Sequence, residues 1–350
     1  MNRASWAVLA LLASAGTARA QDTEPLRLLI QADAGLWPSP PPPAPASGFA
    51  RWRRIRVGDE LSGHAVHVRA LLEWQPQTVA GQPPATLAGG QMPFGGPIRM
   101  TEVFAGWAPH RAFEVDAGSL RVPFSRSRQM DEADLPLPER AAFIDAFTPD
   151  FRTGASVGGD LGEIQYRFAI LSADRTVDQH LFDRGVIAAG RLVAEPIGPV
   201  GLRPWRRAEG DPWTDWFRFA GGLSVLYGTL AAPKTLALDP ELTAQWRRFE
   251  VSAEYFLSTR LASGTSFQTS GVQGAVLEPG LTFLHGQQHL VARAEWQRAG
   301  DATTWGAGGA WTAYAPDPRW RLTMGFERRW SSVDPLSKYW LIFRLTLALD

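Results

Sequence analysis

Arginine is the residue type that could do the most chemistry in this chain of 350 residues. Lysine occurs only at Lys234 and Lys338, so nearly every cationic side chain is a guanidinium group. Each guanidinium can form two parallel hydrogen bonds to a phosphate or a carboxylate. A row of them along one surface would attract an anion and pass it from site to site. Codon bias in a GC-rich genome is the alternative origin of this composition.

Residue spacing places many of these arginines on one side of period-two segments. Between residues 319 and 330, an apolar series that begins and ends with tryptophan alternates with a polar series of arginines and one glutamate. Successive side chains of a strand point to opposite faces, so we expect lipid on one side and water on the other. Arg328 is the exception on the apolar side, near a strand end from which it can reach the interface. The same alternation gives these water-facing, pore-lining candidates: Arg27, Arg54, Arg56, Arg69, Arg167, Arg218, Arg248, Arg293, Arg321 and Arg344.

Carboxylates share the water-facing side with these arginines. Arginine and glutamate on neighbouring strands would pair and hold the inner surface together instead of binding a solute. Both interpretations of each inward arginine therefore stay open. The carboxylates are Asp33, Glu73, Glu163, Glu250, Glu254, Glu295 and Glu327.

Alternating segments of about ten residues recur along the whole chain and predict an all-β fold. We expect a closed antiparallel transmembrane β-barrel of sixteen strands, with fourteen or eighteen as alternatives. The region after the eighth strand is the least regular, because Pro240 would interrupt a ladder and residues 196–215 could hide a further strand. The expected strand starts are Leu26, Phe49, His64, Ile98, Ala112, Phe151, Gly162, Gly185, Trp216, Lys234, Phe249, Gln268, Gln288, Thr303, Arg319 and Lys338.

The connections between the expected strands alternate between long and short, as in outer-membrane barrels. The longest, residues 122–150, is counted as the third external loop, and residues 137–147 are its one helix candidate. We expect this loop to fold into the pore. Its carboxylates outnumber its arginines. The candidates for a constriction are Arg121, Arg126, Arg128 and Arg140.

The first twenty residues predict a secretory signal. Arg3 precedes a short apolar stretch, and Ala18-Arg19-Ala20 matches a cleavage site. The barrel would then occupy residues 21–350, in a bacterial outer membrane. With no cysteine and a net charge of zero, thiolate sites are excluded and a nucleic-acid partner is not expected.

Tryptophans cluster near the expected strand ends, which is typical of two aromatic girdles at the lipid interfaces. Ordinary core tryptophan is the alternative. The residues are Trp52, Trp74, Trp107, Trp216, Trp246, Trp296, Trp311, Trp320, Trp330 and Trp340.

Several segments are similar to one known family. They are the opening strand at residues 29–34, the arginine cluster at 53–58, and above all Gly118-Ser119-Leu120-Arg121-Val122-Pro123-Phe124-Ser125. In these segments the chain resembles the phosphate-selective porin O and P family. The resemblance implies a sixteen-stranded, usually trimeric outer-membrane barrel with its third loop in the pore. It does not carry phosphate selectivity over, because that family uses loop lysines and this third loop has none.

An enzyme was considered because Gly154-Ala155-Ser156-Val157-Gly158 matches the G-x-S-x-G pattern. That motif needs a turn from strand to helix, and here it lies inside an expected strand. Nothing in the sequence brings a histidine to Ser156, so we expect no catalytic residue, no metal site and no cofactor.

These observations predict a passive outer-membrane porin for small anionic or neutral solutes, with an anion or phosphate preference. Its partners would be outer-membrane lipid and two further copies in a homotrimer. A plugged or structural barrel with a binding role is the first alternative. A barrel hydrolase using Ser156 and a soluble periplasmic β-protein are more distant ones.

Overall fold

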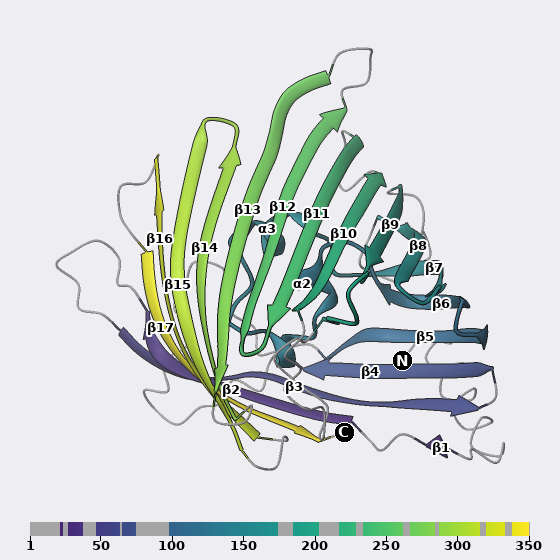
Figure 1. The fold of residues 1–350 in the computed structure, drawn as a ribbon, viewed down its shortest axis with the longest axis horizontal. Coiled ribbons are helices and arrows are strands. Elements are labelled where there is room, and N and C mark those ends of the chain that lie inside the picture. Colours follow the sequence, from purple (N-terminus) through teal and green to yellow (C-terminus); the bar gives the residue numbers. More distant parts are fainter. Residues whose placement is uncertain are drawn as a thin grey trace.

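The computed structural model describes twelve ranges of the chain, and the predicted signal at residues 1–20 lies outside them. The ranges are 22–23, 27–37, 47–63, 65–74, 98–173, 185–202, 217–228, 234–261, 267–283, 287–315, 320–332 and 338–349. Figure 1 shows their strands curving around a common interior.

Sixteen strands form a closed antiparallel barrel, as predicted. Each pairs with the next along the chain, and β17 returns to pair with β2. The two-residue β1, Asp22–Thr23, pairs beside the end of β3. The first eight barrel strands are β2 (Arg27–Trp37), β3 (Ser47–Gly63), β4 (Val66–Trp74), β5 (Ile98–His110), β6 (Phe113–Arg121), β7 (Phe151–Asp160), β8 (Ile164–Ser172) and β9 (Val186–Ala194). The others are β10 (Phe217–Gly228), β11 (Lys234–Trp246), β12 (Phe249–Leu261), β13 (Phe267–Phe283), β14 (Gln288–Ala299), β15 (Ala302–Tyr314), β16 (Trp320–Ser331) and β17 (Lys338–Leu349).

The two uncertain points after the eighth strand have definite structures. β9 pairs directly with β10, so no further strand enters the barrel between them. Pro240 lies inside β11 and is paired with Leu223 of β10. On the β12 side the ladder passes from Leu238 directly to Glu241, which leaves Pro240 without a partner where it has no amide hydrogen to donate.

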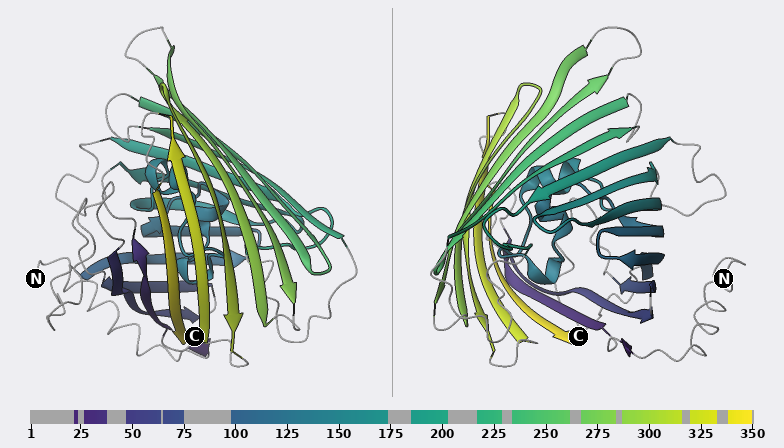
Figure 2. Two further views of the ribbon diagram at one scale, coloured as in Figure 1. Left: turned by 90° about the vertical axis from the view of Figure 1, so that its left-hand side faces the viewer. Right: turned by 45° about the vertical axis from the view of Figure 1, so that its right-hand side comes forward.

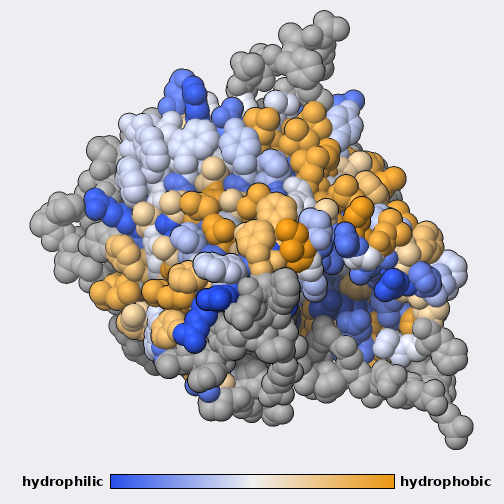
Figure 3. Space-filling model, in the orientation of Figure 1, coloured by the Kyte–Doolittle hydropathy of each residue, from blue (hydrophilic) through white to orange (hydrophobic). Residues whose placement is uncertain are grey.

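The strands separate an apolar outer face from a polar inner face. Along β16, Leu322, Met324 and Phe326 are exposed on the outside, whereas Arg321, Thr323 and Glu327 are buried. Figure 3 shows patches of apolar side chains on the face of the molecule that it draws. The period-two pattern in the sequence therefore records an outside-inside alternation.

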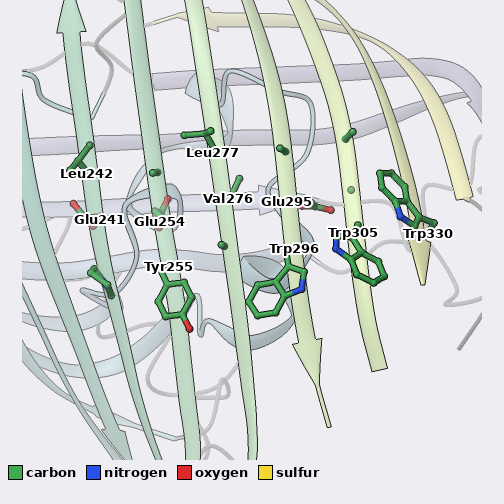
Figure 4. Close-up of a pocket in the computed structure, with 16 residues that line it drawn as sticks. Glu241, Leu242, Glu254, Tyr255, Val276, Leu277, Glu295, Trp296, Trp305 and Trp330 are labelled. Atoms are coloured by element: carbon green, nitrogen blue, oxygen red, sulfur yellow. The ribbon is translucent and has the colours of Figure 1, made fainter. Parts of the chain in front are cut away.

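Tryptophans on the outer face lie toward the strand ends. Trp296, Trp305 and Trp330 face one another in register across β14, β15 and β16. They border a shallow outer depression of about 770 Å³, and Figure 4 shows them on the face opposite Glu295. Trp340 differs from the rest, because the guanidinium of inward-facing Arg329 lies 4.6 Å from the centre of its ring. The side chains of Trp52 and Trp216 lie outside the described ones.

The predicted alternation of long and short connections holds only for the first half of the chain. Tight turns follow β3, β5 and β7, opposite the long connections. Residues 195–216 then form a long connection on the tight-turn side, and β14 joins β15 on the other side through Gly300 and Asp301. Gly300 has a φ of 60°, which suits a two-residue hairpin.

The segment between β6 and β7, residues 122–150, holds the short helices of the described chain. They are α2 (Arg126–Gln129), the 3-10 turn η1 (Glu132–Asp134) and α3 (Ala142–Phe147). The helix expected at 137–147 is shorter than predicted, because Pro138 lacks an amide hydrogen and disfavours helix at the residue before it. Figure 2 shows these short elements within the ring of strands. Among the described helices, none has the length and apolar character needed to cross a membrane.

Candidate functional site

Arginine–carboxylate pairs between strands cover part of the inner face of the barrel. Arg293 on β14 donates to Glu278 of β13 at 2.6 Å and to Glu327 of β16 at 2.8 Å. Arg344 on β17 is 1% exposed and holds Asp33 of β2 through two hydrogen bonds, at 2.7 and 3.1 Å. Buried charges are tolerated when they are paired in this way. Pairing, the alternative weighed from the sequence, therefore describes these arginines.

Segment 122–150 binds to this inner face through a second set of charges. Arg56 donates to both carboxylate oxygens of Asp131, at 2.9 and 2.8 Å, and Arg54 pairs with Glu132. On β14 the amide of Ala142 donates to Glu295 at 3.0 Å. The segment is thus tied to β3, near the start of the chain, and to β14, which is four strands before β2 closes the barrel.

The other side of the segment is apolar. Phe124, Phe143 and Ile144 are completely buried against inward-facing residues of β8 to β13, among them Phe256. The ring of Phe143 occupies the space in which a side chain at Gly274 would lie, since a Cβ there would come within 2.6 Å of the ring. Part of the interior is therefore a packed hydrophobic core, a feature that the strand pattern did not predict.

The start of the segment is fixed by one buried glutamate of β12. Glu254 accepts from the Ser125 hydroxyl at 2.6 Å and from the Ser127 amide at 2.9 Å. Ser125 has a φ of 64°, which is unusual for a residue with a side chain. These hydrogen bonds offset the cost of that conformation.

Charge also sets the ionisation of Glu132 within this segment. Burial alone would raise the pKa of Glu132, but Arg54, Arg140 and Arg53 hold that pKa well below its ordinary value of 4.5. Glu132 is therefore an anion at neutral pH and serves as an attachment point for the segment.

In three pairs between strands of the inner face, the guanidinium is more exposed than the carboxylate. Arg167 is 37% exposed and its partner Asp116 1%, Arg69 is 24% exposed and Glu102 6%, and Arg329 is 22% exposed and Glu295 6%. Pairs between the wall and segment 122–150 show the opposite order, because Asp131 is more exposed than Arg56. A solute at the three pairs Arg167–Asp116, Arg69–Glu102 and Arg329–Glu295 would meet nitrogen before oxygen.

The ten arginines predicted to line a pore differ in their positions. Arg54, Arg56, Arg293, Arg321 and Arg344 are buried on the inner face, and Arg69 and Arg167 are partly exposed there. Arg218 is also partly exposed and donates to the carbonyl of Pro199 at 3.2 Å. Arg248 lies in the turn between β11 and β12, outside both strands. The side chain of Arg27 lies outside the described ones.

The four constriction candidates mostly stabilise segment 122–150 itself. Arg128 donates to the Thr148 carbonyl at 2.9 Å, and Arg140 donates to the carbonyls of Ser127 and Met130, both at 2.9 Å. Arg126 is buried and donates to Leu202 at 2.9 Å. Arg121 is the most exposed of the four and joins Glu102, at 3.0 Å, to the carbonyl of Gln129, at 2.7 Å.

The predicted set omitted several inward-facing arginines, among them Arg53, Arg191 and Arg329. Arg53 joins Arg54 on the inside because a register shift opposite Gln31 and Ala32 inserts it as an extra residue, and it binds Glu139 at 2.7 Å. Arg191 pairs with Glu241 at 2.5 Å, on a strand whose faces were hard to assign. Arg329 was on the predicted polar face but was not selected. A bulge has no signature in the alternation, so only the last two could have been found.

Ser156 lies within β7, as the sequence predicted, and the hydrolase motif has no elbow. The structure nevertheless brings a histidine near it. Asp116 accepts from the Ser156 hydroxyl at 3.2 Å, and His67 Nε2 lies 2.9 Å from the other oxygen of Asp116. Because the carboxylate lies between the hydroxyl and the imidazole, His67 is not placed to take the proton of Ser156.

Solved structures share this architecture at low sequence identity. They include an anion-selective porin from Comamonas acidovorans, with a TM-score of 0.61, 10% identity, and coverage of 94% of this chain and 100% of that one. A BenF-like porin from Pseudomonas fluorescens Pf-5 has a TM-score of 0.56 and 11% identity, with coverage of 94% of this chain and 99% of that one. The trimer form of OmpT from Vibrio cholerae has a TM-score of 0.56 and 7% identity, with coverage of 94% of this chain and 99% of that one. No protein-family model and no curated protein matches the chain. The chain therefore has the porin fold, and membership of the O and P family stays a prediction.

Proposed function

We propose that the chain is a bacterial outer-membrane porin, a channel through which small solutes diffuse passively. The observation that carries this proposal is a closed barrel that is apolar outside and lined by paired charges inside. In water an exposed apolar surface of this extent would drive association, whereas in a bilayer it is the surface that contacts lipid.

The dimensions of β16 support a membrane-spanning position. From Trp320 to Trp330 the strand rises by about 33 Å, at about 3.3 Å per residue. A tilt of about 40° reduces this to about 25 Å, the height of the apolar band in outer-membrane barrels. The two tryptophans would then lie at the two interfaces with the lipid headgroups.

Within the barrel, segment 122–150 would narrow the channel. Its Asp131 and Glu132 bind the β3 arginines, and Phe143 packs on the far wall, so the segment crosses the interior. The water-filled passage would follow β4 to β9 and the adjoining wall, where Arg69 and Arg167 are accessible. The resemblance in sequence to the O and P family, which implies a third loop in the pore, supports this proposal.

We propose a modest preference for anions in this passage. The exposed guanidinium edges of Arg69, Arg167 and Arg329 support it, and so does the description of the Comamonas structure as an anion-selective porin. A preference for phosphate over other anions is a narrower proposal. It rests on the two parallel hydrogen bonds that a guanidinium can donate to an oxyanion. The exposed carboxylates of segment 122–150 keep the expected preference small.

We further propose a homotrimer embedded in outer-membrane lipid. One of the structures of the same fold is described as a trimer form. Crosslinking of the detergent-purified protein tests this, and a monomer at every detergent concentration would exclude it.

The central experiment is conductance in planar lipid bilayers. Purified protein should insert in discrete steps, each with an ohmic current. A salt gradient of potassium chloride, followed by one of potassium phosphate, then measures selectivity through the reversal potential. A sign that favours potassium in both salts would exclude the anion preference without affecting the channel itself.

A plugged barrel with a structural or binding role is the second candidate. The completely buried Phe124, Phe143 and Ile144 favour it, because they close part of the interior with apolar contacts. Such a barrel would insert into bilayers without conducting. Insertion that is confirmed by protease protection but gives no current steps would select this function.

A further inference from the structure

A histidine and two carboxylates meet on the inner face near the tight-turn end of the barrel. His67 on β4 lies opposite Gly106 on β5, and Gly106 lies opposite Asp116 on β6. Because Gly106 has no side chain, the imidazole and the carboxylate meet above it. A Cβ at Gly106 would come within 2.1 Å of His67 Nε2 and 2.3 Å of Asp116 Oδ1.

The next row of the sheet repeats this arrangement. Glu114 on β6 lies opposite Gly158 on β7, which lies opposite Arg167 on β8. Arg167 reaches across this glycine and donates to Glu114 Oε2 and Asp116 Oδ2, at 2.7 Å each. Arg167 therefore binds one oxygen of each carboxylate, and the other oxygen of each, Oε1 of Glu114 and Oδ1 of Asp116, lies on the side of His67.

Three ligand atoms thereby converge. His67 Nε2 lies 2.9 Å from Asp116 Oδ1 and 3.4 Å from Glu114 Oε1, and all three atoms lie within 4.8 Å of one another. Ligands bound at about 2.1 Å with angles of about 90–109° are separated by about 3.0–3.4 Å. The separation of 3.4 Å lies in this range and that of 2.9 Å lies just below it, so the three atoms are close enough to share one metal ion. Within the described ranges, this is the one group of three such residues found.

We propose that His67, Glu114 and Asp116 form a binding site for one divalent transition-metal ion of the zinc class. One imidazole and two carboxylates favour Zn²⁺, Cu²⁺ or Ni²⁺ over Mg²⁺ and Ca²⁺, which take oxygen ligands.

The surroundings support the same class of ion. The two carboxylates and Arg167 together carry a charge of −1 beside the imidazole, which attracts a dication. Arg167 and the Ser156 hydroxyl orient the carboxylates as outer hydrogen-bond partners do at metal sites. Phe104 fixes the His67 ring edge-on at a centroid distance of 5.8 Å. Partial exposure of His67 and Glu114 leaves room for water to complete the coordination.

The test is calorimetric titration of the purified barrel in detergent, after chelator treatment and removal of any polyhistidine tag, with Zn²⁺ as the probe. We expect one saturable site per chain that excess Mg²⁺ does not block. His67→Ala should weaken binding by more than about tenfold. His110→Ala is the matched control, because His110 lies exposed at the end of β5, and it should bind as the wild type does.

Gly106→Ala supplies a second variant that keeps all three ligands. Its methyl group would displace the ends of the His67 and Asp116 side chains, so the barrel can fold while the site opens. It should also weaken binding by more than about tenfold. Absence of a saturable Zn²⁺ site in the wild type, or unchanged binding in both His67→Ala and Gly106→Ala, would overturn the proposal. Neither result depends on whether the barrel conducts.

Discussion

Individual arginines of the inner face have two different roles, and exposure separates them. Arg344 and Arg293 are buried and hold carboxylates of neighbouring strands together. Arg69 and Arg121 also pair with Glu102 but keep an edge in contact with water. Substitution of a buried arginine should therefore change the stability of the barrel. Substitution of a partly exposed arginine should change which ions pass through it.

Arg344→Met should destabilise the barrel by about 3–5 kcal/mol, because it leaves Asp33 buried without its main partner. Urea unfolding of the detergent-refolded barrel, followed by tryptophan fluorescence, measures this. The matched control is Arg344→Met combined with Asp33→Leu, which removes both charges and should cost less than the single change. A double variant that is less stable than the single one would contradict the pairing.

Arg121→Gln should shift the reversal potential in a chloride gradient toward cations, because it removes a partly exposed cation from the inner face and leaves Glu102 with Arg69 as its remaining arginine partner. The control is Arg328→Gln, on the exposed outer face of β16, which should leave the potential unchanged. Equal shifts in the two variants would show that the assignment of inner and outer faces is wrong.

Among the elements, segment 122–150 differs most from what the strand pattern describes. Its charged side binds the wall through Asp131 and Glu132, and its apolar side packs against β8 to β13. This combination makes the segment an internal layer of the barrel rather than a surface loop.

Phe143→Ala should loosen the segment, since it removes a completely buried ring at a cost of about 3–5 kcal/mol. We expect a larger single-channel conductance and faster hydrogen exchange in residues 122–150. Exchange in β14 to β17 serves as the internal control and should not change. A conductance equal to that of the wild type, together with faster exchange, would show that the segment does not limit the passage.

Acid should release the segment through Glu132. Because the folded state holds the pKa of Glu132 below its ordinary value of 4.5, the stabilisation is fully present above that value. It is lost as pH falls through the lower folded-state pKa. Conductance should therefore stay constant from pH 7 to about pH 4.5 and change only below it.

Glu132→Gln should reproduce the acid effect at pH 7. The same bilayer recordings measure it, with wild-type protein at pH 7 as the reference. A Glu132→Gln variant that conducts as the wild type does at pH 7 would exclude Glu132 as the attachment point.

The strands were predictable and the contacts between them were not. Lipid outside and a polar interior force period-two alternation, which the chain shows as clearly at β16 as at β8. Register is set by pairing across the sheet, so the meeting of His67 with Asp116 above Gly106 has no trace in either strand alone. Arg53 was missed because a bulge changes the face of a residue without changing its neighbours in sequence.

At the scale of the whole molecule, the apolar outer face requires the barrel to fold into a lipid bilayer. Phe326→Arg places a cation near the middle of β16 on the outside and should cost about 2–4 kcal/mol in a bilayer. Trp330→Arg lies near the strand end and should cost about 0–1 kcal/mol. Urea titration of folding into lipid vesicles measures both. Equal costs at the two depths would contradict a membrane-spanning β16.

The most direct measurement is single-channel recording of the purified wild-type protein in planar bilayers. Stepwise, ohmic currents are predicted, together with larger steps after deletion of residues 126–147. Repeated insertion of folded protein without any current step, in the wild type and in the deletion variant alike, would contradict the proposal that this barrel is a channel.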